Sequence, residues 1–182
     1  MISVITACYN SGKTIEKAIE SLLRQTNHNF EHVIIDGQSK DNTLDVIKGY
    51  RPQYEEKGIR LTVISEKDTG IYDAMNKGIL NSSGELIGIL NSDDWYPPNT
   101  IEIIEENHKR HPEADIIMGA SETINGNSKS IRKVRLRRFL TSRDFNHGAM
   151  FVKKDCYMDI GTYDACGNIY ADFKWYIKAR KE

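Results

Sequence analysis

Two adjacent aspartates, Asp93 and Asp94, are the residues in this sequence whose chemistry is easiest to specify. They follow residues 85–90, a short and largely apolar segment typical of a buried strand. Neighbouring carboxylates repel each other unless a cation lies between them or one of them is protonated. Such oxygen ligands suit Mg²⁺ or Mn²⁺, and Mg²⁺ in particular binds one or two carboxylates together with substrate phosphates. The pair therefore predicts a divalent-cation site that could neutralise a leaving diphosphate. The alternative is an exposed acidic turn that caps the next helix.

A third carboxylate, Asp36, ends the apolar segment 32–35 and precedes Gly37. A carboxylate at a strand end can accept hydrogen bonds from the two hydroxyls of a ribose or from an imino group of a base. The alternative is that Asp36 only forms the turn before the glycine.

Residues 7–14, Ala-Cys-Tyr-Asn-Ser-Gly-Lys-Thr, end in the Gly-Lys-Thr of a phosphate-binding P-loop. Ala7 occupies the position where that loop requires glycine, and Gly12 is the segment's single glycine. A P-loop protein that binds a nucleoside triphosphate is therefore a minor alternative.

The elements that position these side chains alternate between strands and helices. Apolar segments predict strands at 2–7, 32–35, 61–64, 85–90 and 115–118. Stripes at helical spacing predict helices at 15–23, near 44–47, at 71–80 and at 100–109. This alternation is typical of an α/β fold with a mostly parallel sheet covered on both faces.

The pattern changes beyond residue 119, where the chain is predicted to be α+β. An Asn-Gly turn at 125–126 predicts a hairpin between 122–124 and 130–136. A strand near 149–152 and a final helix from Asp172 follow. We expect a single domain over 1–182, in which 1–119 bind the nucleotide-sugar and metal and 120–182 supply the acceptor site and catalytic base.

Ligands of open α/β sheets bind outside the carboxyl ends of the strands. Three polar clusters fall there: Tyr9-Asn10, Asp36-Gly37 and the segment 91–94. Because they come from separate parts of the sequence, their convergence predicts one binding site.

The composition sets limits on the class of protein. The chain has 182 residues, 39% hydrophobic and 28% charged, which is normal for one globular domain. A net charge of −1 gives no sign of a nucleic-acid partner. The three cysteines form no CxxC pair, and the N-terminus lacks the basic region of a signal peptide. We therefore expect free thiols and a cytoplasmic location.

Five short motifs, in order along the chain, resemble those of glycosyltransferase family 2. They are Thr6-Ala-Cys-Tyr-Asn10, the Asp-Gly-x-Ser-x-Asp-Asn-Thr stretch within 34–43, Ala74-Met-Asn-Lys-Gly78, Ser83-Gly-Glu85 and Asn91-Ser-Asp-Asp94. The resemblance covers roughly residues 1–120 and extends more loosely to 182. It implies a GT-A fold, a UDP- or similar nucleotide-linked sugar donor, a divalent cation and inversion at the anomeric carbon.

The resemblance also implies roles for single residues in the donor site. Asp36 would contact the base or ribose, in a pocket lined by Thr6, Tyr9 and Asn10. Asp93 would lie near the ribose and diphosphate.

Two further roles concern the metal and the reaction. Asp94 would ligate the cation, Mg²⁺ or Mn²⁺. The segment 170–175 resembles the family's acidic segment, which makes Asp172 the general base. The alternative for Asp172 is a favourable charge at a helix N-terminus.

The chain departs from the family at Ala171, where glutamate is frequent, and at Met75, where arginine is frequent. The string 66–78 instead resembles a sub-group that acts in bacterial surface-polysaccharide assembly. That similarity implies donor contacts from a short set of residues: Asp68, Tyr72, Asp73 and Asn76. Helix capping is the alternative for Asp68.

Two features suggest contacts in the second half of the chain. His147 lies where the sub-group tends to place histidine, which implies a contact with metal or diphosphate; a structural histidine is the alternative. The segment 129–138 is basic, with interleaved apolar residues. It predicts a flap over a lipid-linked or other anionic acceptor, or peripheral contact with the inner membrane face; a solvated strand is the alternative.

The resulting hypothesis is an inverting glycosyltransferase that moves a sugar to a carbohydrate or lipid-linked acceptor. Two competing hypotheses are a catalytically impaired homologue that binds nucleotide-sugar, and a nucleotidyltransferase. The sequence ends inside a predicted helix, so a truncated C-terminus and a minimal acceptor region are both open.

Overall fold

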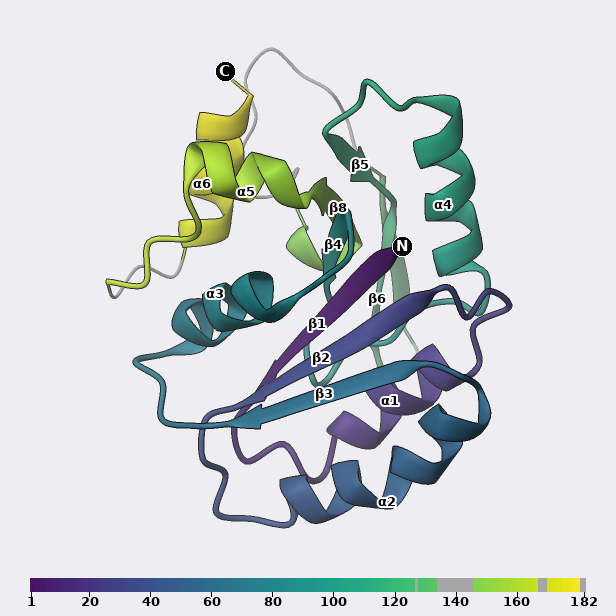
Figure 1. Cartoon of the computed structure of the whole chain (residues 1–182), viewed down its shortest axis with the longest axis vertical. Helices are drawn as coiled ribbons and strands as arrows, with labels where there is room; N and C mark the ends of the chain where they lie inside the picture. Colours follow the sequence, from purple (N-terminus) through teal and green to yellow (C-terminus); the bar gives the residue numbers. More distant parts are fainter. Residues whose placement is uncertain (127, 134–145, 167–169, 181–182) are drawn as a thin grey trace.

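The sheet of the protein is built around strands that are buried on both faces. Figure 1 shows the computed structural model, which describes residues 1–126, 128–133, 146–166 and 170–180. The main sheet has the order β3-β2-β1-β4-β8-β5. Its strands are β1 (Ile2–Cys8), β2 (Phe30–Asp36), β3 (Arg60–Ser65), β4 (Leu86–Ile89), β5 (Ile116–Met118) and β8 (Met150–Lys153).

Strand β8 is the one feature of this sheet that departs from parallel pairing. β1 pairs in parallel with β2 and β4, and β2 with β3. β8 is antiparallel to both β4 and β5, and it lies between them. The predicted α/β fold with a mostly parallel sheet is therefore confirmed. The strand expected near 149–152 is also present as β8, but its antiparallel direction and its position between β4 and β5 were not predicted.

Three helices cover each face of the sheet. The core on one face contains residues of α1 (Ile15–Leu23), α2 (Thr43–Glu56) and α4 (Thr100–Arg110). The other contains residues of α3 (Ile71–Asn81), α5 (Lys154–Ile160) and α6 (Ala171–Ala179). Figure 1 shows α1 and α2 across β1, β2 and β3 from α3, and α4 across β4, β8 and β5 from α5 and α6. None of the described helices is long and apolar enough to cross a bilayer.

Alternation along β1 sends side chains to both layers. Val4 packs in the cluster with α1, and Ile5 packs in the cluster with α3. A Cβ at Gly78 in α3 would overlap the Cγ2 of Ile5. The missing side chain therefore lets α3 lie directly on β1.

The second half contains the predicted hairpin and two short helices that were not predicted. β6 (Ser121–Asn125) and β7 (Ser128–Arg132) form the predicted hairpin as a separate two-stranded sheet. A 3₁₀ helix, η2 (His147–Ala149), leads into β8, and α5 follows directly. Neither η2 nor α5 was predicted, because both are too short to show a clear periodicity.

A buried histidine in β2 makes stability depend on pH. His32 Nδ1 lies 2.7 Å from the Tyr54 hydroxyl and Nε2 lies 2.9 Å from Thr6 Oγ1. Complete burial of the imidazole lowers the pKa of His32 to about 3. In the unfolded chain the ring takes up a proton near pH 6.5, so falling pH favours unfolding.

We expect the free energy of unfolding to fall by about 2 kcal/mol between pH 7.5 and 5, through this residue. Urea titrations at several pH values measure the effect. His32→Gln should flatten the dependence, while His28→Gln, at a partly exposed position, should leave it unchanged. An equally steep dependence in His32→Gln would contradict the assignment.

Candidate functional site

Loops that follow three parallel strands meet at one edge of the sheet. β1 ends at Cys8, β2 at Asp36 and β4 at Ile89. The hydroxyls of Ser11 and Ser92, from the first and third of these loops, lie 2.9 Å apart. The polar clusters expected at the carboxyl ends of the strands therefore come together.

Asp36 is completely buried and its carboxylate is held by two serines. Ser39 donates to it from both its backbone N–H and its hydroxyl. The Ser65 hydroxyl donates to Oδ2 at 2.6 Å. These bonds fix the orientation of a charged group that would otherwise be costly to bury.

Tyr9 and Asp68 converge beside Gly37. A Cβ on Gly37 would overlap Asp68 Oδ2 and would lie 3.4 Å from the Tyr9 ring. Tyr9 is 61% exposed. The glycine thus lets the Asp68 carboxylate and the edge of the Tyr9 ring lie close against its backbone.

The other residues predicted in this pocket have different surroundings. Asn10 adopts a left-handed φ of 50°, and its Oδ1 accepts from the Lys40 N–H at 2.8 Å. Thr6 is completely buried against His32. The structure therefore places Asn10 at the edge, while Thr6 bonds to His32 within the sheet. A donor contact from Thr6 stays a prediction.

A continuous hydrogen-bonded chain crosses the site. Tyr72 donates to Asp172 Oδ1 at 2.9 Å, and His147 Nδ1 lies 2.7 Å from Asp172 Oδ2. His147 Nε2 lies 3.3 Å from Asn91 Oδ1, and Asn91 Nδ2 donates to Asp94 Oδ2 at 3.0 Å. The chain joins the loop after β4 to residues of α3, η2 and α6, so it connects the two halves of the sequence.

The antiparallel direction of β8 explains how His147 reaches this edge. A strand that runs opposite to its neighbours begins where they end, so the residues before Met150 lie beside the end of β4. Asn146 Oδ1 accepts from the Gly148 N–H at 3.0 Å, and this bond fixes the turn of backbone that contains His147. The backbone around Gly148 lies close to Asp94, whose Oδ2 would be 3.8 Å from a Cβ there.

The environment of Asp172 favours its ionised form. Burial opposes ionisation, but the bonds from His147 and Tyr72 and the charge of His147 outweigh it and lower the pKa of Asp172. Burial, followed by the bond to Asp172, raises the pKa of Tyr72 to about 12. Asp172 is therefore available as a proton acceptor at neutral pH, while Tyr72 remains a donor.

Two further residues from the predicted donor set bond to the protein itself. Asp73 Oδ2 accepts from the Thr69 N–H at 2.9 Å and lies 3.5 Å from Lys77 Nζ. Asn76 donates to the Tyr163 carbonyl at 2.8 Å and accepts from the Tyr163 N–H at 2.9 Å. Direct donor contacts from Asp73 and Asn76 stay predictions.

The predicted metal ligands differ in how well they fit a cation. Among the residues that the structure describes, no group of three or more His, Cys, Asp or Glu is arranged to hold a metal ion. Asp93 and Asp94 are both exposed at the sheet edge, whereas both ring nitrogens of His147 face protein acceptors. The carboxylates fit the mode in which one or two protein ligands share Mg²⁺ with substrate phosphates.

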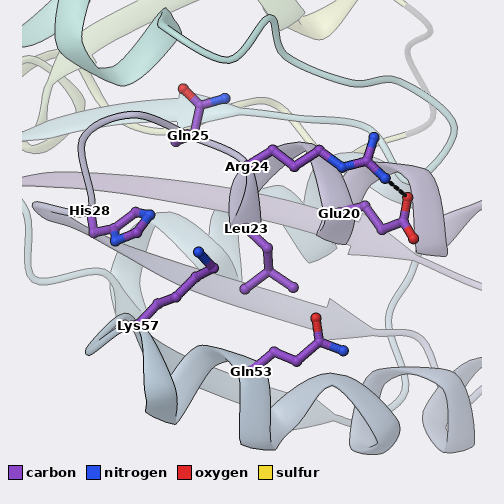
Figure 2. Close-up of a pocket in the computed structure, with 7 residues that line it drawn as sticks. All are labelled: Glu20, Leu23, Arg24, Gln25, His28, Gln53 and Lys57. Carbon is purple, nitrogen blue, oxygen red and sulfur yellow. Dashed lines mark hydrogen bonds and ion pairs between the residues drawn. The ribbon is translucent and has the colours of Figure 1, made fainter.

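A hollow of the described surface lies away from these residues. Figure 2 shows this hollow of about 450 Å³, lined from the ends of α1 and α2 by Glu20, Leu23, Arg24, Gln25, His28, Gln53 and Lys57. These residues precede β2 and β3, so they lie at the opposite edge of the sheet from Asp172. We assign the hollow no part in the site.

The basic segment 129–138 lies partly outside the described residues, which resume at 146 after 133. Its described part includes Ile131, which is 65% exposed, and Lys129, whose Nζ lies 3.8 Å from Glu122. The predicted acceptor or membrane contact stays a prediction.

Carboxylates lie at the carboxyl edge of this sheet, and a His–Asp pair from the second half of the chain joins them there. The family model "Glycosyl transferase family 2" matches residues 3–174. The chain therefore belongs to glycosyl transferase family 2, a family of transferase enzymes.

Three relatives illustrate the match. A "PGL/p-HBAD biosynthesis glycosyltransferase" of Mycobacterium bovis (strain BCG / Pasteur 1173P2) is 30% identical over 179 residues, covering 98% of this chain and 69% of that protein. S. aureus TarS 1-349 in complex with UDP-GlcNAc superposes with a TM-score of 0.81 at 22% identity, covering 98% of this chain and 52% of that one.

The third is the mannosyltransferase PcManGT from Pyrobaculum calidifontis, in complex with GDP-Man and Mn²⁺. It superposes with a TM-score of 0.66 at 16% identity, covering 91% of this chain and 48% of that chain. The chain thus spans about half the length of the TarS 1-349 structures it matches. The predicted family and GT-A fold are confirmed.

The P-loop alternative is wrong. The N–H groups of Ser11 and Gly12 donate to Thr43 Oγ1 at 2.8 Å and to Asp41 Oδ2 at 3.0 Å. A carboxylate therefore occupies the position that a phosphate would need. The family match likewise replaces the nucleotidyltransferase hypothesis.

Sequence reasoning underrated two members of the hydrogen-bonded chain. Asn91 stood inside a family motif but was not singled out, and Tyr72 was expected to contact the donor. Their partners lie 56 and 100 residues away, at His147 and Asp172. The motifs at 66–78 and 91–94 marked the two residues, but neither motif indicated its partner.

Proposed function

We propose that this protein is an inverting glycosyltransferase that moves a sugar from a UDP-sugar to a hydroxyl of a carbohydrate or lipid-linked acceptor. The observation that carries the proposal is the carboxylate of Asp172, held between Tyr72 and His147 and joined through Asn91 to Asp94. This arrangement brings a candidate base to the edge where the donor would bind.

The reaction is a single displacement. Asp172 takes the proton of the acceptor hydroxyl, and the oxygen forms a bond to the anomeric carbon on the face opposite the diphosphate. The bond between that carbon and the diphosphate oxygen breaks, and the nucleoside diphosphate leaves with the electron pair. His147 and Tyr72 hold the base in its ionised form throughout the approach of the acceptor.

A divalent cation fits the carboxylates of this edge. Asp94 would hold it, with Asp93 beside it and the donor phosphates completing the ligands. When bound, such a cation stabilises charge on the departing diphosphate. The Mn²⁺ in the complex of the similar mannosyltransferase supports this choice of ligand chemistry.

The donor pocket is the region around Asp36, Gly37 and Tyr9. Buried Asp36 offers a fixed acceptor for ribose or base, and exposed Tyr9 offers a face for stacking. The UDP-GlcNAc complex of TarS, whose fold is similar, supports uridine as the nucleoside. The choice of sugar and acceptor rests on contacts outside this set.

The test is thermal unfolding with UDP, GDP, CDP and dTDP, each with Mn²⁺ and again with chelator. Ligand at about a hundred times its dissociation constant adds roughly 2.7 kcal/mol of stability, or about 5–10 °C for a chain of this size. We expect the full shift with UDP and Mn²⁺ only. An equal shift with chelator would remove the metal from the proposal, and no shift with any diphosphate would overturn the donor site.

Ala171 favours one second candidate. Glutamate is frequent at this position in the family, so its absence is compatible with a homologue that binds nucleotide-sugar without transfer. Release of UDP from UDP-GlcNAc, with water as the acceptor, distinguishes the two: binding without release identifies the impaired homologue.

A further inference from the structure

The segment 66–78 contains the polar residues Tyr72 and Asn76, whose side chains bond to the second half of the chain. The Tyr72 hydroxyl bonds Asp172, and Asn76 bonds both backbone groups of Tyr163. Asp172 and Tyr163 lie 100 and 87 residues further along the sequence. Helix α3 therefore has two separate attachments to the part of the chain that supplies the base.

The first attachment fixes the carboxylate itself. With Tyr72 on Oδ1 and His147 on Oδ2, the two oxygens of Asp172 are bonded to side chains from two different elements. A carboxylate accepts about four hydrogen bonds, so each oxygen keeps capacity for an acceptor hydroxyl. Rotation of the carboxyl group is blocked while its role as a proton acceptor is preserved.

The second attachment holds Tyr163, which follows α5 in the described segment 146–166. Both hydrogen bonds of Asn76 go to the backbone of Tyr163, in the manner of a paired strand. The rings of Tyr72 and Tyr163 are in contact, with centroids 5.7 Å apart, and the Tyr163 hydroxyl lies 2.8 Å from that of Tyr157. The segment is thereby tied both to α3 and to the core beneath α6.

We infer that Tyr72 and Asn76 are positioning residues for the base Asp172, not donor contacts. This inference rests on the proposed function, because it assigns Asp172 the proton transfer. It gives the motif at 66–78 a defined purpose: the loop that contains Asp68 leads into α3, and Tyr72, in the first turn of that helix, bonds the base. The short segment from Asp68 to Tyr72 thus sets the distance between the proposed donor pocket and the base.

The test compares Tyr72→Phe with Tyr50→Phe, using UDP release from UDP-GlcNAc. Tyr50 donates to Glu16 at 2.6 Å on the opposite face, so the control also loses a tyrosine–carboxylate bond. We expect kcat to fall about tenfold in Tyr72→Phe, with KM for UDP-GlcNAc and the UDP-induced thermal shift unchanged. Tyr50→Phe should leave kcat unchanged.

A second pair of variants controls for effects on folding. Asn76→Ala should lower kcat without changing UDP binding, whereas Asn81→Ala, which loses a bond to Lys77 on the same helix, should not. In an Asp172→Asn background, Tyr72→Phe should have no further effect on the residual rate. Equal effects in both backgrounds would show a general structural role and overturn the inference.

The failures are distinguishable. If Asp172→Asn retains the wild-type rate, the proposed base is wrong. If Asp172→Asn is inactive but Tyr72→Phe has the wild-type kcat, the proposed function stands and the positioning role is overturned. Loss of UDP binding in Tyr72→Phe would make Tyr72 a donor contact and overturn the inference as well.

Discussion

Asp172→Asn should reduce the rate of UDP release from UDP-GlcNAc by about 10²–10⁴-fold while leaving the UDP-induced thermal shift intact. Asparagine has the same shape as aspartate and can still accept from Tyr72 through its carbonyl oxygen, but it cannot take up the acceptor proton. The low pKa of Asp172 makes this loss visible at neutral pH, where the native carboxylate is ionised.

Asp159→Asn is the matched control, because Asp159 is an exposed aspartate in the neighbouring helix α5. Its rate should equal that of the native chain. Wild-type turnover in Asp172→Asn, with the control unchanged, would require another base.

Asp94→Asn should abolish both the transfer and its dependence on Mn²⁺. The loss of one charged ligand removes the stabilisation of the departing diphosphate, an effect worth several kcal/mol, or roughly 10³-fold in rate. The UDP-induced thermal shift should become the same with Mn²⁺ and with chelator. The side-chain oxygen of the new asparagine can still accept the hydrogen bond from Asn91 Nδ2. The hydrogen-bonded chain to His147 should therefore survive.

The companion variant is Asp93→Asn, at the adjacent exposed carboxylate. If Asp94 is the principal ligand, this variant should retain part of the Mn²⁺-dependent shift. Full activity and an undiminished metal dependence in Asp94→Asn would assign the cation to other residues.

The first half of the fold could be predicted because its elements leave local signals. Val4 and Ile34 in buried strands, and Ile15 and Ile19 on a helix stripe, show apolar patterns that match their burial. The direction of β8 could not be predicted, because Met-Phe-Val-Lys forms a buried strand equally well in either direction. Its orientation is decided by pairing with β4 and β5, far away in the sequence.

In the candidate site, too, the residues with local signals could be predicted, and their distant partners could not. The residue types at Asp36, Asp94 and Asp172 were found because motifs place carboxylates at the ends of elements. Their partners were not, since the bond from Tyr72 to Asp172 spans 100 residues and no spacing encodes it. Asn76 was likewise found through its motif, but its bonds to the backbone of Tyr163, 87 residues away, were not predicted.

The insertion of β8 between β4 and β5 sets an order in which the protein can assemble. β5 has no other partner among the described strands, so it can join the sheet only after residues 150–153 have been synthesised and have paired with β4. Until then the edge of β4, a strand buried along its whole length in the finished protein, is open to other chains. His147 arrives with the same strand, so closure of the sheet and formation of the His147–Asp172 pair belong to one late event. A nascent chain that lacks this strand would have the carboxyl edge of β1, β2 and β4 without His147, and its open β4 edge would be prone to pair with copies of itself.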